Sequence, residues 1–146
     1  MHHKKIALVV LFSALALASL AAQKFDESAV ISSMDRETVS AYLKFLGYSP
    51  ENVKEKSIRF NLQGYKCYLS VNESDLQAYA WFEGPADPEL INKFNSEYRF
   101  ASAYYDEEND VCIQSDLDFA GGSTLGALKE FIKTFGSLLE DYSSLE

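Results

Sequence analysis

The 146-residue chain contains few of the residues on which most catalytic and metal sites depend. It has two cysteines, three prolines, seven glycines and two histidines, and both histidines, His2 and His3, stand near the N-terminus. Basic residues are also in deficit, because 13 Lys and Arg face 22 Asp and Glu and give a net charge of −9. Surfaces that bind nucleic acid or anionic lipid need clustered cations. The composition therefore argues against a nucleic-acid partner and against a lipid-binding patch.

Residues 1–22 have the pattern of a secretory signal peptide. A short basic region precedes an apolar run from Ile6 to Leu20, and small residues follow at Ala21 and Ala22. The run is shorter than the ~20 residues that a membrane-spanning helix needs. We therefore favour cleavage after Ala21 or Ala22 over a transmembrane anchor. We expect a periplasmic or secreted protein with no membrane contact after cleavage.

Cleavage would remove both histidines and leave a mature chain without imidazole. Catalysis by Ser-His-Asp or Cys-His groups and zinc sites that contain histidine would then be excluded. Two cysteines, Cys67 and Cys112, remain. A disulfide between them would contribute roughly 4 kcal/mol in the chain-entropy model. Strand alternation, however, assigns the two residues to opposite faces of their strands, which disfavours an intrachain bond.

The length allows one domain, and the sequence pattern divides the chain into three parts. We expect a signal peptide over 1–22, an N-terminal tether over 23–33 and a single folded domain over 34–146. The chain is rich in apolar residues, since 47% of it is hydrophobic and 14% is aromatic. Such a composition excludes a disordered or fibrous chain.

Apolar residues at helical spacing predict three helices. We expect the first near 34–46, the second from Pro88 to about Tyr98 and the third from Ser123 to about Tyr142. Gly47 is the expected stop of the first helix, because glycine commonly follows a helix C-terminus. The expected N-caps are Ser32 or Ser33, Asp87 and Ser123.

Alternation of apolar and polar residues predicts five strands, near 57–62, 65–71, 76–82, 100–105 and 111–117. Short turns join the first two strands and the last two, so these pairs must be antiparallel. The element order is therefore α-β-β-β-α-β-β-α. This order indicates an α+β domain in which helices pack on one face of a five-stranded, mainly antiparallel sheet.

The same alternation gathers aromatic side chains on the sheet face opposite the core. Tyr68, Tyr79 and Trp81 share this face, and either Tyr104 or Tyr105 joins them. A sheet face that combines aromatic, basic and amide side chains is typical of protein recognition. Two alternatives remain open: the rings can simply stabilise the sheet as cross-strand pairs, or the N-terminal tether can cover them.

The acidic turn over 106–110 invites a calcium interpretation, because Ca²⁺ prefers carboxylate and carbonyl oxygens. An EF-hand loop that starts at Asp106 would place Val111 where glycine is required and Leu117 where glutamate is required. We therefore interpret the segment as a solvated hairpin turn.

Two further patterns near the last strand have structural interpretations that we prefer. Asp116 and Asp118 share a strand face, as paired catalytic carboxylates would, but either can instead accept hydrogen bonds from the following loop. Gly121-Gly122-Ser123 precedes a helix, where free N–H groups can bind an anion. The Gly-Lys-Ser/Thr of a phosphate-binding loop is missing, so a tight turn into a capped helix is the expected role.

Several short motifs together resemble one protein family. They are Leu46-Gly47-Tyr48, Ile58-Arg59-Phe60, Gly64-Tyr65 and, above all, the run from Asp110 through Ser115, Asp116 and Leu117 that leads to Gly121, Gly122 and Ser123. Over about 34–142 the chain resembles the YbjN family of bacterial sensory transduction regulators, whose fold is similar to that of type III secretion chaperones. The resemblance implies a non-enzymatic, protein-interacting domain that is often dimeric, with structural rather than catalytic motif residues.

The leading interpretation is an exported, non-enzymatic binding domain that acts through protein contacts, either as a regulator or in a chaperone-like role. The expected partner is an unidentified protein or a second copy of the chain. The alternative is a small secreted carboxylate-based hydrolase or a glycan-binding protein, since aromatic faces also stack on sugars. A hydrolase would need a cleft with two carboxyl groups ~5–9 Å apart and a raised pKa. We assign no catalytic residue, metal ligand or cofactor.

Overall fold

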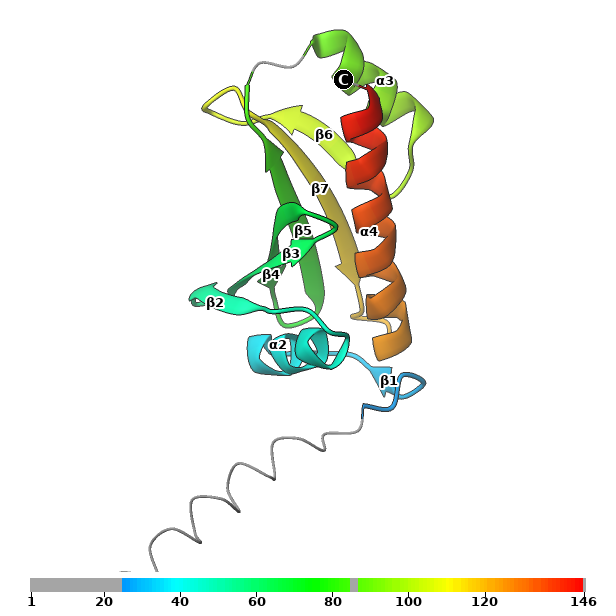
Figure 1. Cartoon of the computed structure of the whole chain (residues 1–146). Coiled ribbons are helices and arrows are strands. Elements are labelled where there is room, and N and C mark those ends of the chain that lie inside the picture. The colour runs from blue at the N-terminus through cyan, green and yellow to red at the C-terminus, as the bar shows by residue number, and fades with distance from the viewer. Residues whose placement is uncertain (1–24, 85–86, 146) are drawn as a thin grey trace, which may run out of the picture.

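The computed structural model describes residues 25–84 and 87–145 (Figure 1). The predicted signal peptide lies outside these residues. The described segments form an α+β fold with one large sheet and three helices, as the sequence pattern predicts. None of the helices within the described ranges combines the length and the apolar character that a membrane span requires.

The large sheet is antiparallel throughout and has six strands, so the expectation of five was wrong by one. In spatial order the strands are β2 (Glu51–Lys54), β3 (Ser57–Leu62), β4 (Tyr65–Val71), β5 (Asp75–Phe82), β7 (Val111–Asp118) and β6 (Ser102–Tyr105). The strand missed by sequence reasoning is β2, whose four residues are all exposed. A strand with no buried residue shows no apolar alternation, and therefore no signal of its own.

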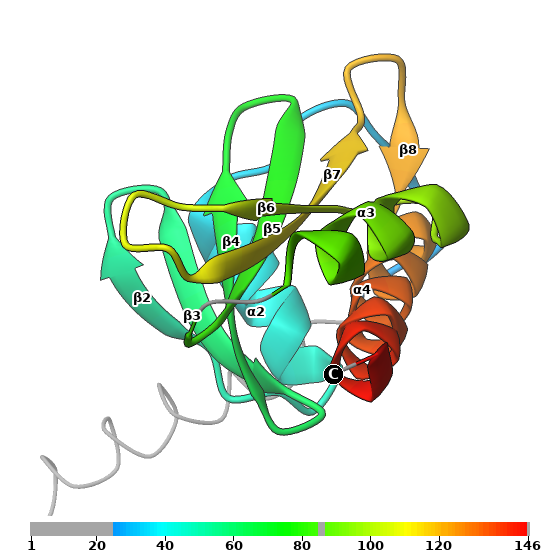
Figure 2. The same cartoon turned by 90° about the horizontal axis from the view of Figure 1, so that it is seen from above.

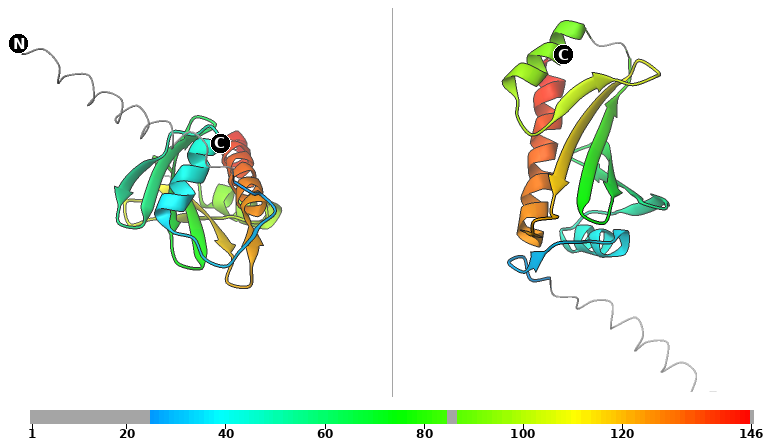
Figure 3. Two further views of the ribbon diagram at one scale, coloured as in Figure 1. Left: turned by 90° about the horizontal axis from the view of Figure 1, so that it is seen from below. Right: turned by 180° about the vertical axis from the view of Figure 1, so that it is seen from behind.

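The three helices are α2 (Arg36–Phe45), α3 (Pro88–Glu97) and α4 (Leu125–Leu145). Figures 1 and 3 show α4 running along one face of the sheet, with α3 near its C-terminal end and α2 across the other end. Tyr142 of α4 joins these layers, because its ring centroid lies 4.7 Å from that of Phe82 and 5.5 Å from that of Phe94. The core therefore lies between the helices and a single face of the sheet. Figure 2 shows α4 running beside the sheet in a view from above.

The ends of α2 follow from local hydrogen bonding. Asp35 is the N-cap, because its side chain accepts a hydrogen bond of 2.7 Å from the backbone N–H of Thr38. The expected caps, Ser32 and Ser33, were therefore wrong by two or more positions. Gly47 was predicted correctly as the stop: its φ is +94°, and its N–H donates to the carbonyl of Lys44 at 3.0 Å.

Of the other two predicted N-caps, one is confirmed and one was wrong. Asp87 caps α3 as predicted, accepting from the N–H of Glu89 at 2.9 Å, and Pro88 occupies the first turn. Ser123, however, belongs to a short strand, β8 (Ser123–Thr124). Thr124 takes the capping role at α4, because its hydroxyl oxygen accepts from the N–H of Ala127 at 3.0 Å.

The part of the tether that the structure describes is packed against the domain. Within it, β1 (Val30–Ile31) pairs antiparallel with β8. The ring of Phe25 lies 5.1 Å from that of Tyr42, and Glu27 forms an ion pair of 3.1 Å with Lys129. These contacts attach the segment to α2 and α4, which lie on the helix side of the sheet.

At one edge of the sheet, a side chain forms hydrogen bonds with the backbone of the edge strand. Asn95 of α3 donates its amide hydrogen to the carbonyl of Ala103 at 2.9 Å and accepts the N–H of Ala103 at 2.8 Å. Ala103 belongs to β6, the last strand on that side of the sheet. The carboxamide of Asn95 thus supplies the two hydrogen bonds that a further strand would make there.

Candidate functional site

The strand register defines two distinct faces of the sheet, and we call the face away from α4 the outer face. One row across the outer face consists of Arg59, Tyr68, Tyr79, Gln114 and Ser102, and a second contains Trp81, Cys112 and Tyr104. The prediction that Tyr68, Tyr79 and Trp81 share the face opposite the core is therefore confirmed. Of the two candidates for a fourth member, Tyr104 lies on this face, whereas Tyr105 lies on the same side as the buried Ala103.

Four aromatic side chains of the outer face, Tyr68, Tyr79, Trp81 and Tyr104, form what we call the aromatic patch. The rings of Tyr79 and Trp81 are nearly parallel, with centroids 5.8 Å apart, and Tyr68 meets Trp81 edge-on at 5.4 Å. Trp81 nevertheless keeps 42% of its surface exposed and Tyr104 keeps 39%. The patch is thus internally packed and still open to solvent. The described part of the tether packs on α2 and α4 instead of covering it.

The polar groups within the patch are held by hydrogen bonds to one another. The Tyr104 hydroxyl donates to Oε1 of Gln114 at 3.1 Å, and Nε2 of Gln114 donates to the Asp116 carboxylate at 3.3 Å. The Tyr79 hydroxyl donates to Gln77. Burial raises the pKa of Tyr79 and of Tyr104, and a hydrogen bond with Cys112 adds to the shift at Tyr104. Both phenols therefore remain protonated well above neutral pH.

Charged residues border the patch on both sides. On the β3–β4 side, Arg59 pairs with Glu51, and this pairing raises the pKa of the guanidinium. On the other side, β6 and β7 are joined by an acidic turn that projects away from α4 (Figures 1 and 3). Glu107 and Glu108 in this turn are exposed. The patch thus has a neutralised border on one side and an acidic border on the other.

The two cysteines lie on opposite faces of the sheet, as predicted from strand alternation. Cys67 is opposite Ala80 in the register and lies in the core, whereas Cys112 is opposite Trp81 and lies on the outer face. Both are free and buried. Burial raises the pKa of the Cys67 thiol to about 12, and burial likewise raises that of Cys112. Neither thiol has the lowered pKa of a reactive nucleophile.

Most residues of the motif that carries the family resemblance form hydrogen bonds or packing contacts within the fold. The buried hydroxyl of Ser115 donates to the carbonyl of Phe100, which has a φ of +72° and begins the turn into β6. Leu117 packs against the core, and Asp116 lies exposed on the outer face. A Cβ on Gly122, whose φ is +94°, would lie 3.2 Å from a methyl carbon of the β1 residue Val30. Gly121 precedes it in an open position.

The acidic turn and the Asp116–Asp118 pair also have structural contacts. The Asp106 carboxylate accepts from the N–H groups of Glu108 and Asp110 at 2.9 and 3.0 Å and so closes the hairpin turn. Asp118 accepts from the N–H of Ala120 at 2.8 Å, which is the loop role anticipated for one of the two aspartates. Among the described residues there is no group of three or more His, Cys, Asp or Glu side chains placed to hold a metal ion.

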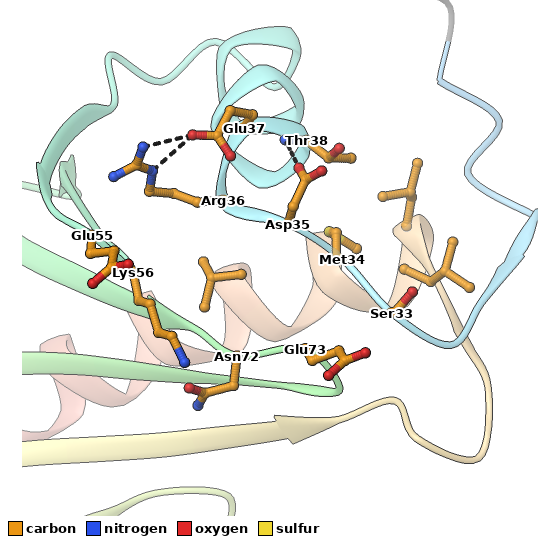
Figure 4. Close-up of a pocket in the computed structure, with 13 residues that line it drawn as sticks. Ser33, Met34, Asp35, Arg36, Glu37, Thr38, Glu55, Lys56, Asn72 and Glu73 are labelled. Carbon is orange, nitrogen blue, oxygen red and sulfur yellow. Dashed lines mark hydrogen bonds and ion pairs between the residues drawn. The ribbon is translucent and has the colours of Figure 1, made fainter.

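A pocket of about 600 Å³ lies at the N-terminus of α2, where no sequence motif pointed (Figure 4). Three of its six charged side chains are engaged with other groups of the fold. Arg36 donates to Glu37 and to the carbonyl of Lys54 at 2.8 Å, and Asp35 is the helix cap. These hydrogen bonds lower the pKa of Asp35 and of Glu37. A general acid would need a raised pKa, so these two carboxyl groups do not suit that role.

The architecture defines a class of protein: a single α+β domain with helices on one side of its sheet and an open aromatic patch on the other. A model of the family described as "YbjN: Putative bacterial sensory transduction regulator" matches residues 35–144. The chain therefore belongs to the YbjN family.

A solved structure supports the same fold. The "Crystal structure of YbjN, a putative transcription regulator from E. coli" superimposes with a TM-score of 0.64 and covers 78% of this chain and 91% of its own. The sequence identity is 12%, so the similarity concerns the fold alone. No curated protein matches the chain.

Proposed function

We propose that this chain is an exported, non-enzymatic binding domain that acts through protein contacts on the aromatic patch, in a regulatory or chaperone-like role. One observation carries the proposal: Trp81 and Tyr104 are 42% and 39% exposed on a sheet face that no described helix covers. Large aromatic side chains on a flat, exposed surface are typical centres of protein interfaces. The family description, a sensory transduction regulator, is compatible with such a role. Export rests on the sequence pattern of residues 1–22.

The patch is suited to recognition because its side chains are ordered before a partner arrives. Trp81 is held by ring contacts with Tyr68 and Tyr79, and Tyr104 is held by its hydrogen bond to Gln114. Ordered side chains lose little conformational entropy on binding, so more of the contact energy appears as affinity. The sugar-binding alternative would use the same rings, and the test below separates the two.

Trp81→Ala tests the proposal. We expect the variant to lose affinity for a protein partner by ~2 kcal/mol or more, as for hot-spot residues. Because Trp81 is 42% exposed, the free energy of unfolding should fall by less than the ~3–5 kcal/mol typical of a buried aromatic residue. Urea denaturation measures stability. Capture from a periplasmic extract on immobilised protein, followed by mass spectrometry, compares the wild type with the variant.

Two control variants sharpen this comparison. Phe135→Ala removes a core ring that is 1% exposed and should show the full loss of stability. Phe100→Ala removes a ring that is 78% exposed but lies outside the patch, and it should retain the captured proteins. The proposal fails if Trp81→Ala captures the same proteins as the wild type, or if only glycans depend on Trp81.

A further inference from the structure

Three exposed carboxylates lie in the two loops at the end of the sheet where the aromatic patch is most exposed. Glu83 follows the end of β5 two residues after Trp81, and Glu107 and Glu108 lie in the β6–β7 turn soon after Tyr104. The N–H of Gly84 donates to the Asp110 carboxylate at 3.0 Å, which joins the loop after β5 to the acidic turn. Segments that are distant in sequence thus form one acidic border at this end of the sheet, next to the ends of the strands that carry Trp81 and Tyr104.

In the described parts of the chain, no ion pair joins a cation to this border. Within residues 25–84 and 87–145 the ion pairs involve Glu27, Glu37, Glu51 and Glu130. Of the basic residues on the outer face, Arg59 is already paired with Glu51, and Lys66 is on β4, on the other side of Trp81. The chain as a whole carries a net charge of −9, so its overall field also attracts cations and repels anions.

We propose that the partner docks a Lys- and Arg-rich protein segment on the aromatic patch, with its cations on the rings of Trp81 and Tyr104 and beside Glu83, Glu107 and Glu108. This inference rests on the proposed function and adds the chemistry of the partner. A cation gains from an aromatic face and from an adjacent carboxylate together, because one supplies a quadrupole and the other a charge. An anionic partner would be repelled, and a neutral glycan would leave the border charges unused.

The chain carries a built-in probe, since Trp81 is its single tryptophan. A decapeptide of alternating Arg and Gly, added at low ionic strength, should change the emission of Trp81 in a saturable manner. The same peptide with Glu in place of Arg should leave the emission unchanged. Affinity for the Arg peptide should fall as salt is raised, because the screening length shrinks from ~10 Å at 0.1 M to ~3 Å at 1 M.

Matched double variants separate this site from general attraction to an acidic protein. Glu107→Gln with Glu108→Gln should weaken binding of the Arg peptide about fivefold or more, since two nearby carboxylates are lost. Glu130→Gln with Glu140→Gln removes the same charge from α4, on the other side of the sheet, and should change the affinity by less than twofold. Calorimetric titration of Trp81→Ala should show a loss of about tenfold, as expected when a cation–π contact is removed.

Equal weakening by both double variants would overturn the inference, because it would show attraction by net charge alone. A change in Trp81 emission with cellohexaose but not with the Arg peptide would overturn it in favour of a glycan. If capture depends on Trp81 but the captured partners are acidic, the inference of a cationic segment is wrong, whereas the proposed function is retained. Captured proteins that do not depend on Trp81 would remove both.

Discussion

Cys67 and Cys112 illustrate how one residue type is buried in two different ways. Cys67 lies in the core between the sheet and its helices. Cys112 points to the outer face and is buried there as well, at 1% exposure, beside Trp81 and Tyr104 in the register. Alternation in the sequence correctly separates the two faces. It does not predict that aromatic neighbours bury a residue on the outer face, because that depends on how β5 and β6 pair on either side of β7.

The raised pKa of Cys67 predicts a loss of stability in alkali. The folded thiol stays protonated up to about pH 12, whereas an unfolded thiol ionises near 9. Unfolding therefore releases a proton above pH 9, and the free energy of unfolding should fall between pH 9 and pH 12. Cys67→Ala should reduce this slope, while its cavity lowers stability equally at every pH. Urea denaturation at pH 8, 10 and 11 measures the slopes.

Part of the alkaline slope should survive in Cys67→Ala. The pKa of Tyr42 is also raised to about 12, by burial and then by the neighbouring Glu27, so its phenol contributes in the same direction. Identical slopes in the wild type and the variant would show that Cys67 does not titrate as its buried position implies.

At the scale of elements, predictability follows the number of buried residues in each segment. β3, β4 and β5 each alternate over six or more residues and were predicted almost to the residue. β1 and β8 have two residues each and have no pattern to detect. The start of α2 was misplaced because Ser32, Ser33 and Asp35 are all good caps, and only the backbone path selects Asp35.

The cap of α2 gives a prediction with a matched control. Asp35→Ala should destabilise the protein by ~1 kcal/mol, because the Thr38 N–H loses its acceptor. Asp35→Asn should retain most of the stability, since the amide oxygen can accept the same hydrogen bond. Thermal denaturation at pH 7 compares the three proteins. A smaller loss in the alanine variant than in the asparagine variant would contradict this assignment.

The same hydrogen bond determines the direction in which stability changes with pH. Donation from Thr38 lowers the pKa of Asp35 below its usual value, so the folded state holds the carboxylate more strongly than the unfolded state. The stabilisation of the folded state by the Asp35 carboxylate is therefore complete above about pH 4. It declines as the pH falls through the pKa of Asp35 in the folded state. In Asp35→Asn this part of the acid dependence should be missing.

At the scale of the whole molecule, the sequence predicted the outer face but not its charged border. Strand alternation alone placed Tyr68, Tyr79 and Trp81 together, because each residue needs only its own strand. The acidic border depends on the contact between Gly84 and Asp110, which are 26 residues apart. The pocket beside α2 likewise draws on several distant segments. Such groupings follow from tertiary packing, which local periodicity does not encode.

The proposed export predicts a defined N-terminus for the exported protein. If residues 1–22 act as a cleavable signal, the mature chain begins at Ala22 or Gln23. Intact-mass analysis of protein from the periplasm or the medium measures this directly. Recovery of the chain with Met1 in place would contradict the signal peptide and, with it, the expected location.

The carboxamide of Asn95 has a consequence for how copies of this chain can assemble. A filament that grows by sheet extension needs two different free edge strands in each copy, because one edge of each copy must pair with the other edge of the next. Asn95 already occupies the backbone of Ala103 at one margin. The edge that stays free is β2, so two copies can join only by pairing β2 with β2. This arrangement has two-fold symmetry and is complete after two molecules. Where copies of this chain join through the edges of the large sheet, the expected product is therefore a dimer.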